Sequence, residues 1–130
     1  MAAKKQKILV VEDNKDEAKL VEIILSQEGY KVALAPDGKV GLEMVKSFEP
    51  DLIILDVMMP ELDGFSACQK IKGSEKKNIP IILLTGVAKQ IRKTKYPLDG
   101  VLRADADEYL EKPVNPEELL KTVKKYMDKA

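Results

Sequence analysis

The chain has 130 residues, the length of one globular domain. Its 22 basic and 22 acidic residues cancel, so its charge gives no reason to expect direct binding to nucleic acid. One cysteine and no histidine exclude an internal disulfide and every catalytic or metal site that needs histidine. The apolar stretches are too short for a membrane span or a secretory signal, which predicts a cytoplasmic protein without membrane insertion.

Short apolar runs alternate along the chain with patterns typical of helices. This alternation predicts an α/β fold, in which one parallel sheet is covered by helices on both faces. The predicted strands are Ile8–Val11, Lys31–Ala35, Leu52–Asp56, Ile81–Thr85 and Glu108–Glu111. We expect them to form a single domain over residues 5–128, preceded by a flexible N-terminus at residues 1–4.

Helical patterns follow each of the first three strands. The first helix should begin after Asn14, a favourable N-cap residue, and end just before Gly29. A second helix is expected over about Gly38–Ser47, and a third from near residue 64 to near residue 73.

The last two helices differ in how clearly the sequence marks them. A fourth helix over Val87–Tyr96 should be short or broken, because Pro97 and Gly100 follow it. The last helix is the clearest, with Asn115 as its cap and Pro116 in its first position.

Acidic side chains follow two of the predicted strands. Glu12 and Asp13 come directly after the first strand, and Asp56 ends the third. Because the carboxyl ends of parallel strands share one edge of the sheet, we expect these carboxylates to converge and to raise each other's pKa. A divalent cation would relieve that repulsion. The pattern therefore predicts a Mg²⁺ site beside a carboxylate, Asp56, that can accept a phosphoryl group.

Four motifs make a family resemblance specific. They are LVVEDN (residues 9–14), LDVMMPELDG (55–64), PIILLTG (80–86) and DEYLEKPV (107–114). In this order, each at the end of a strand, they resemble the receiver domain of a two-component response regulator of the chemotaxis-receiver type. The resemblance covers nearly the whole chain. It implies a flavodoxin-like, doubly wound five-stranded sheet with strand order 2-1-3-4-5.

The resemblance also implies which residues hold the metal and accept the phosphoryl group. Asp56 would be the phosphorylated residue. Glu12, Asp13 and Asp56 would bind Mg²⁺ together with the backbone carbonyl of Met58. Simpler structural roles exist for the acids, since Asp56 could cap a turn and Asp13 could cap the first helix.

A second set of residues would respond to the phosphoryl group. Thr85 would donate its hydroxyl to a phosphoryl oxygen, and Lys112 would pair with Asp56 before modification and with the phosphoryl group afterwards. The bond between Lys112 and Pro113 is expected to be cis. Tyr109 would be the switch aromatic, which moves when Thr85 is drawn inward.

The apolar residues Met58 and Val87 would flank the site. They should position an attacking water poorly, which predicts slow self-dephosphorylation.

Two features depart from the family pattern: Asp105 replaces a usual glycine, and the stretch Thr85–Lys112 is longer than typical. That stretch is locally basic, which fits either a solvated face or a docking surface for an acidic partner. Its basic residues are Lys89, Arg92, Lys93, Lys95 and Arg103.

The resemblance implies signalling rather than enzymatic turnover. A histidine kinase or phosphotransfer protein would donate the phosphoryl group, and the donor must be a separate molecule because this chain has no histidine. Output would be contact with a downstream protein, without direct nucleic-acid binding, by a monomer or weak dimer. The only reactions catalysed would be phosphorylation and dephosphorylation of the domain itself.

Several alternative functions are compatible with the sequence. The chain could be a receiver fragment of a larger regulator or hybrid kinase, or a docking module that is not phosphorylated. A flavodoxin-like cofactor binder would need a loop rich in glycine and hydroxyl groups where Glu12, Asp13 and Asn14 stand. An aspartate-nucleophile phosphohydrolase would need an acid at the position of Met58.

Overall fold

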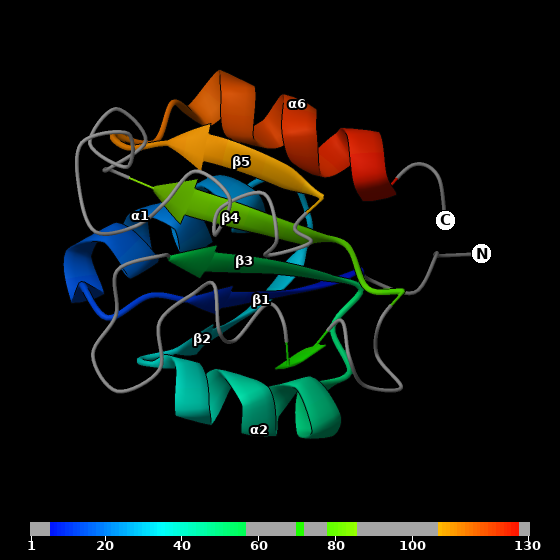
Figure 1. Ribbon diagram of the computed structural model, residues 1–130. Helices are drawn as coiled ribbons and strands as arrows, with labels where there is room; N and C mark the ends of the chain where they lie inside the picture. Colours follow the sequence, from blue (N-terminus) through cyan, green and yellow to red (C-terminus); the bar gives the residue numbers. More distant parts are fainter. Residues whose placement is uncertain (1–5, 57–69, 72–77, 86–106, 128–130) are drawn as a thin grey trace, which may run out of the picture.

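The computed structural model describes residues 6–56, 70–71, 78–85 and 107–127. Helices and strands alternate along the first part of the chain (Figure 1). In chain order the elements are β1 (Lys7–Val11), α1 (Lys15–Ser26), β2 (Lys31–Ala35), α2 (Gly38–Phe48), β3 (Leu52–Asp56), β4 (Ile81–Thr85), β5 (Glu108–Glu111) and α6 (Pro116–Met127).

The five strands form one parallel sheet in the order β2-β1-β3-β4-β5, which confirms the predicted topology. All five arrows point toward the same edge of the sheet (Figure 1). Four strands have the predicted bounds, whereas β1 begins one residue earlier, at Lys7. Lys7 pairs with Lys31 in register, and its N–H donates to the Asp51 carboxylate at 2.8 Å. The backbone contacts thus extend a strand whose first side chain is polar.

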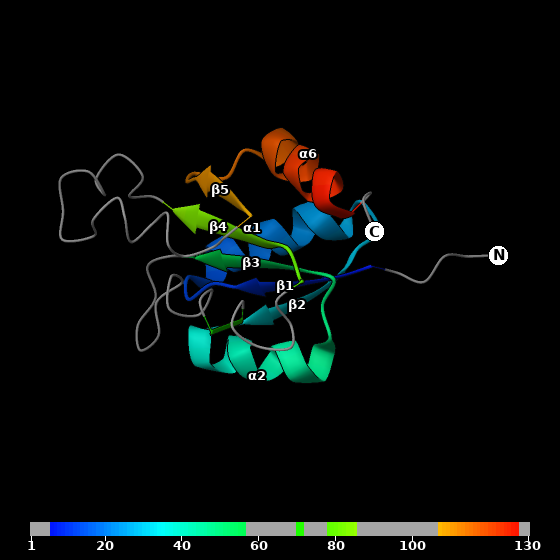
Figure 2. The ribbon, with the colours of Figure 1, turned by 45° about the vertical axis from the view of Figure 1, so that its right-hand side comes forward.

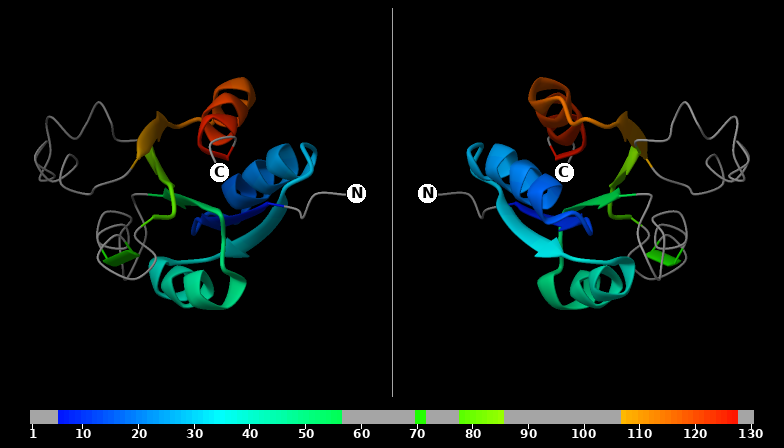
Figure 3. Two further views of the ribbon diagram at one scale, coloured as in Figure 1. Left: turned by 90° about the vertical axis from the view of Figure 1, so that its right-hand side faces the viewer. Right: turned by 90° about the vertical axis from the view of Figure 1, so that its left-hand side faces the viewer.

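Helices cover both faces of the sheet. The pair α1 and α6 lies on one face and α2 on the other, as the view along the layers makes plain (Figure 3). The turned view in Figure 2 shows the same three layers. Alternate strand residues therefore face different helices, and both sets are apolar, as expected for a parallel sheet buried on both sides.

Two hydrophobic cores result from this alternation. The core under α1 and α6 contains Ile8, Val10, Leu52, Ile54, Ile82 and Leu84 with helix residues such as Val21 and Leu119. The core under α2 contains Leu9, Val11, Ile53, Leu55, Ile81 and Leu83 with Val45. Every residue of β3 is buried, so the strand that ends in Asp56 is fixed from both sides.

The helix caps agree with the sequence signals. The Asn14 side chain accepts a hydrogen bond from the Glu17 N–H at 3.0 Å, and the Asn115 side chain accepts one from the Glu118 N–H at 3.0 Å. The helix α1 ends at Ser26, and a turn then leads to Gly29, whose φ of +90° favours glycine. Because α1 follows the carboxyl end of β1, the N-terminus of α1 lies at the carboxyl edge of the sheet.

Several predicted features lie outside the described residues. They include the proposed fourth helix and nearly all of the third, of which only Lys70 and Ile71 are described, both in helical conformation. Residues 1–4 lie outside as well, so the flexible N-terminus stays a prediction. Among the described helices, none has the length and apolar character needed to cross a membrane.

The contact between α2 and β1 generates a stability prediction. A Cβ added at Gly41 would lie 2.8 Å from Cγ2 of Val11, a β-branched side chain that is only 1% exposed. Gly41→Ala should therefore lower the free energy of unfolding by about 1–3 kcal/mol, despite the better helix propensity of alanine. Ser47→Ala, on the exposed side of the same helix, is the control and should be neutral or slightly stabilising. Denaturant unfolding in which Gly41→Ala matches the wild type would contradict this close packing.

Candidate functional site

Three carboxylates meet at the carboxyl edge of the two central strands. Glu12 and Asp13 follow β1, and Asp56 ends the neighbouring strand β3. One carboxylate oxygen from each lies within 4.8 Å of the other two. Glu12 and Asp56 are each only 3% exposed, whereas Asp13 is exposed. The site is therefore an acidic cluster with two buried members and one member open to solvent.

Lys112 joins this cluster from the end of β5. Its Nζ lies 2.8 Å from Oε1 of Glu12 and 3.1 Å from Oδ1 of Asp56. It also lies 2.7 Å from Oε2 of Glu17, in the first turn of α1. The peptide bond between Lys112 and Pro113 is cis, as expected from the sequence. The lysine is thus directed into the acidic cluster rather than into solvent.

Burial and neighbouring side chains shift the pKa values of Glu12 and Lys112. Burial raises the pKa of Glu12 to about 8, and a hydrogen bond with Asp56 contributes in the same direction. The mutual repulsion expected from the sequence therefore acts on Glu12, but burial is the larger cause. Burial alone would lower the pKa of Lys112, yet its carboxylate partners outweigh burial and raise that pKa, so the ammonium stays charged.

Glu12 is held at both oxygens. Its Oε1 accepts a hydrogen bond from Lys112 at 2.8 Å, and its Oε2 accepts one from the backbone N–H of Asn14 at 3.1 Å. The backbone N–H of Glu12 donates to the carbonyl oxygen of Ala35 at 3.0 Å. The Glu12 carboxyl is therefore oriented by Asn14 in its own loop and by Lys112 after β5.

The acidic cluster suits Mg²⁺ by its chemistry. Mg²⁺ takes oxygen ligands at about 2.0–2.1 Å, so oxygens on opposite sides of the ion lie about 4.2 Å apart. One oxygen each from Glu12, Asp13 and Asp56 lies within 4.8 Å of the other two, so rearrangement of these side chains would let all three reach one ion. The fourth predicted ligand, the carbonyl of Met58, lies outside the described residues.

Of the predicted site residues not yet discussed, the structure describes Thr85 and Tyr109. Thr85 ends β4 and pairs in register with Glu111, and only its backbone is described. Tyr109 lies in β5, half-buried, and packs against the core under α2. Val87, like Met58, falls outside the described residues, as does the basic stretch that follows it.

Glu17 is a site residue that the sequence motifs do not mark. In the sequence it stands out only as the residue three positions after the Asn14 cap. The signal that could have found it is that a residue in the first turn of α1 must lie near the carboxyl edge, because α1 begins there. Its contact with Lys112 lowers the pKa of the Glu17 carboxyl, chiefly through the hydrogen bond between the two side chains.

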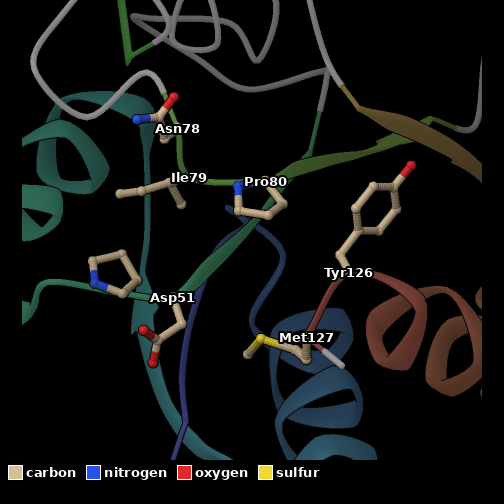
Figure 4. A pocket seen from close by; sticks show the side chains of 7 residues that line it. Asp51, Asn78, Ile79, Pro80, Tyr126 and Met127 are labelled. Carbon is tan, nitrogen blue, oxygen red and sulfur yellow. The ribbon is translucent and has the colours of Figure 1, made fainter. Parts of the chain in front are cut away.

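Of two pockets formed by described residues, one borders the acidic cluster and the other does not. A pocket of about 200 Å³ borders the acidic cluster. It is lined by Glu12, Asp13, Lys15, Ala18, Lys19, Leu34, Ala35 and Pro36. A second pocket of about 420 Å³ lies at the opposite edge of the sheet, between the segments that precede β3 and β4 and the end of α6 (Figure 4). It includes none of the clustered acids, so size alone does not mark the chemical site.

Comparison with known proteins agrees with this geometry. The family described as response regulator receiver domain matches residues 8–124. The chain therefore belongs to the response regulator receiver domains, the phosphorylation modules of two-component systems.

The relatives differ in how much of their own length this chain covers. The chain is 39% identical over 116 residues to the probable transcriptional regulator ycf27 of Galdieria sulphuraria, covering 89% of this chain and 43% of that protein. Chemotaxis protein CheY4 of Vibrio cholerae superposes with a TM-score of 0.83 at 32% identity, covering 95% of this chain and 99% of that one.

A third relative carries the expected metal. The receiver domain of sensor histidine kinase PA1611 from Pseudomonas aeruginosa PAO1 superposes with a TM-score of 0.84 at 31% identity, covering 96% of this chain and 99% of that one. Its structure has a magnesium ion coordinated in the active-site cleft. The chain spans about half the length of the curated relatives it matches first, between 42% and 51%.

The acidic cluster predicts stabilisation by Mg²⁺. Because an ion that binds only the folded state adds to stability, Mg²⁺ at about 100 times its Kd should raise the free energy of unfolding by about 2.7 kcal/mol. Asp13→Asn should reduce this gain in stability, because it removes the negative charge of one carboxylate from the cluster. Asp16→Asn is the matched control, since Asp16 is an exposed acid in the first turn of α1 outside the cluster. Equal Mg²⁺-induced shifts in Tm for both variants would argue against this metal site.

Proposed function

We propose that this chain is a phosphoacceptor receiver whose Asp56 takes a phosphoryl group from a histidine kinase or phosphotransfer protein in the presence of Mg²⁺. The position of Asp56 is the observation that carries the proposal. It is buried at the end of the central strand β3, 3.1 Å from the Lys112 ammonium and within the acidic cluster. In that setting the Asp56 carboxylate is a positioned nucleophile, and the Lys112 ammonium is a positive charge held beside it.

The chemical step is a direct displacement. A carboxylate oxygen of Asp56 attacks the phosphorus, the P–N bond of the donor phosphohistidine breaks, and the donor imidazole leaves with the electron pair of that bond. Glu12 and Asp13 would hold Mg²⁺, which supplies charge neutralisation and a template for the transfer. Lys112, already directed at Asp56, then donates a hydrogen bond to a phosphoryl oxygen.

The response to phosphorylation would pass through neighbouring strands. Thr85 ends β4 beside β5, which contains the half-buried Tyr109. We propose that a bond between the Thr85 hydroxyl and the phosphoryl group changes the packing of Tyr109 and so the surface offered to a partner. Slow loss of the phosphoryl group, expected because Met58 and Val87 are apolar, stays a prediction.

The output depends on what accompanies the receiver. Because the chain spans 43% of the ycf27 relative, a receiver within a longer transcriptional regulator is the second candidate function, in which a separate domain binds nucleic acid. The receiver itself would act through protein contacts. Its cytoplasmic location and its state as a monomer or weak dimer stay predictions.

Phosphorylation of Asp56 can be tested without a protein donor. Incubation with Mg²⁺ and acetyl phosphate should add one phosphoryl group, read by intact mass, and Asp56→Asn should abolish this gain. Asp51→Asn is the matched control, because Asp51 precedes the same strand at its opposite edge and should leave phosphorylation unchanged. A wild-type chain that gains no mass would favour the unphosphorylated docking module, whereas an Asp56→Asn variant that still gains a phosphoryl group would show that another residue is the acceptor.

The donor protein must approach the carboxyl edge, where α1 begins. Leu20 and Ile23 lie one turn apart on α1 and are 47% and 44% exposed, although both are large apolar side chains. Exposed apolar side chains beside a reactive site favour contact with another protein. We therefore assign the donor phosphotransfer protein to this face of α1.

This assignment predicts that transfer from the donor protein and transfer from acetyl phosphate respond differently to substitutions on α1. Leu20→Ser combined with Ile23→Ser should slow phosphoryl transfer from the donor protein by about tenfold or more, since apolar anchors of an interface cost over 1 kcal/mol each when truncated. The rate with acetyl phosphate should not change, because the site residues remain. A donor rate equal to that of the wild type would show that the donor docks elsewhere.

A further inference from the structure

The Lys112 ammonium donates hydrogen bonds to Glu12 and Glu17 and forms an ion pair with Asp56. An ammonium has three N–H donors. Its described partners are Glu17 at 2.7 Å, Glu12 at 2.8 Å and Asp56 at 3.1 Å. A phosphoryl group on Asp56 would draw this ammonium toward itself, and the hydrogen bonds to Glu12 and Glu17 compete with that contact.

The three carboxylates differ in how easily they can leave. The side chains of Glu12 and Asp56 are 1% and 5% exposed, whereas that of Glu17 is 43% exposed. Without Lys112 the buried Asp56 carboxylate would lose its counter-charge and the buried Glu12 carboxyl would lose a hydrogen-bond donor, but an exposed carboxylate is resolvated by water. Glu17 is therefore the partner whose release costs least.

Phosphorylation also changes the charge balance around Lys112. The phosphoryl group carries about −1.5 to −2 charges at neutral pH in place of the single charge of the Asp56 carboxylate. Glu17 is drawn to the same ammonium and adds a further negative charge to that side of the site. Its carboxylate thus stabilises the unmodified site and opposes the modified one.

We propose that Glu17 is a positioning residue that competes with the phosphoryl group for Lys112, so that its release accompanies phosphorylation. The inference rests on the proposed function of Asp56 as phosphoacceptor. It adds that Glu17 influences how readily Asp56 accepts the phosphoryl group. Glu17 does not touch the reacting atoms and acts through the lysine.

Binding of beryllofluoride, a non-covalent stand-in for the phosphoryl group, measures this competition at equilibrium. With saturating Mg²⁺, Glu17→Gln should bind beryllofluoride about two- to fivefold more tightly than the wild type, the size expected for a partly exposed ion pair. Asp16→Asn is the matched control. It removes the same charge from the same helical turn, where both acids face the same helix N-terminus, and should leave the affinity unchanged.

A second measurement separates competition from a general structural role. Glu17→Gln should lower the Tm of the unmodified protein slightly, since Lys112 loses a partner. That difference from the wild type should vanish when Mg²⁺ and beryllofluoride are bound, because Glu17 is then released in the wild type too. A structural role elsewhere in α1 would lower Tm equally in both states.

The possible outcomes separate the role of Glu17 from that of Asp56. Unchanged or weaker beryllofluoride binding by Glu17→Gln, or a Tm difference that persists in the bound state, overturns the role of Glu17 while Asp56 remains the acceptor. A wild-type chain that neither binds beryllofluoride nor is phosphorylated overturns the proposed function itself.

Discussion

The ion-pair cluster around Lys112 is the interaction on which the rest of the site depends. Two buried carboxylates, Glu12 and Asp56, lie side by side at the end of a sheet that is apolar on both faces. Such a pair would be costly without a cation nearby. Lys112 supplies that cation from β5, and Asn14 supplies a backbone N–H to Glu12. The reactive carboxylate is thereby kept in place before metal or donor arrives.

The parallel sheet brings together residues that are far apart in sequence. The order β2-β1-β3-β4-β5 puts the ends of β1 and β3 next to each other, with β4 between β3 and β5. Both faces are filled by large apolar side chains, so the strand ends have little freedom to shift. A rigid sheet with its polar groups at one edge can hold charges at short distances and still leave the surrounding loops free to differ between relatives.

The strands and the acids could be predicted from the sequence for a physical reason. Buried parallel strands are continuous apolar runs, and the run Leu52–Leu55 before Asp56 is typical of such a strand. The start of β1 at Lys7 could not be predicted from hydrophobicity, because backbone pairing with Lys31 and the Asp51 carboxylate extend that strand. The Glu17–Lys112 contact joins residues 95 positions apart and depends on how α1 leaves the sheet, which no local pattern encodes.

A crystal structure of the protein with Mg²⁺ and beryllofluoride would test the role of the Lys112 cluster most directly. We expect one Mg²⁺ ion bound by oxygens of Glu12, Asp13 and Asp56, with beryllofluoride on Asp56 and the Lys112 ammonium bonded to a fluoride. An ion bound away from these acids, or a Lys112 side chain turned away from Asp56, would be incompatible with the proposed site.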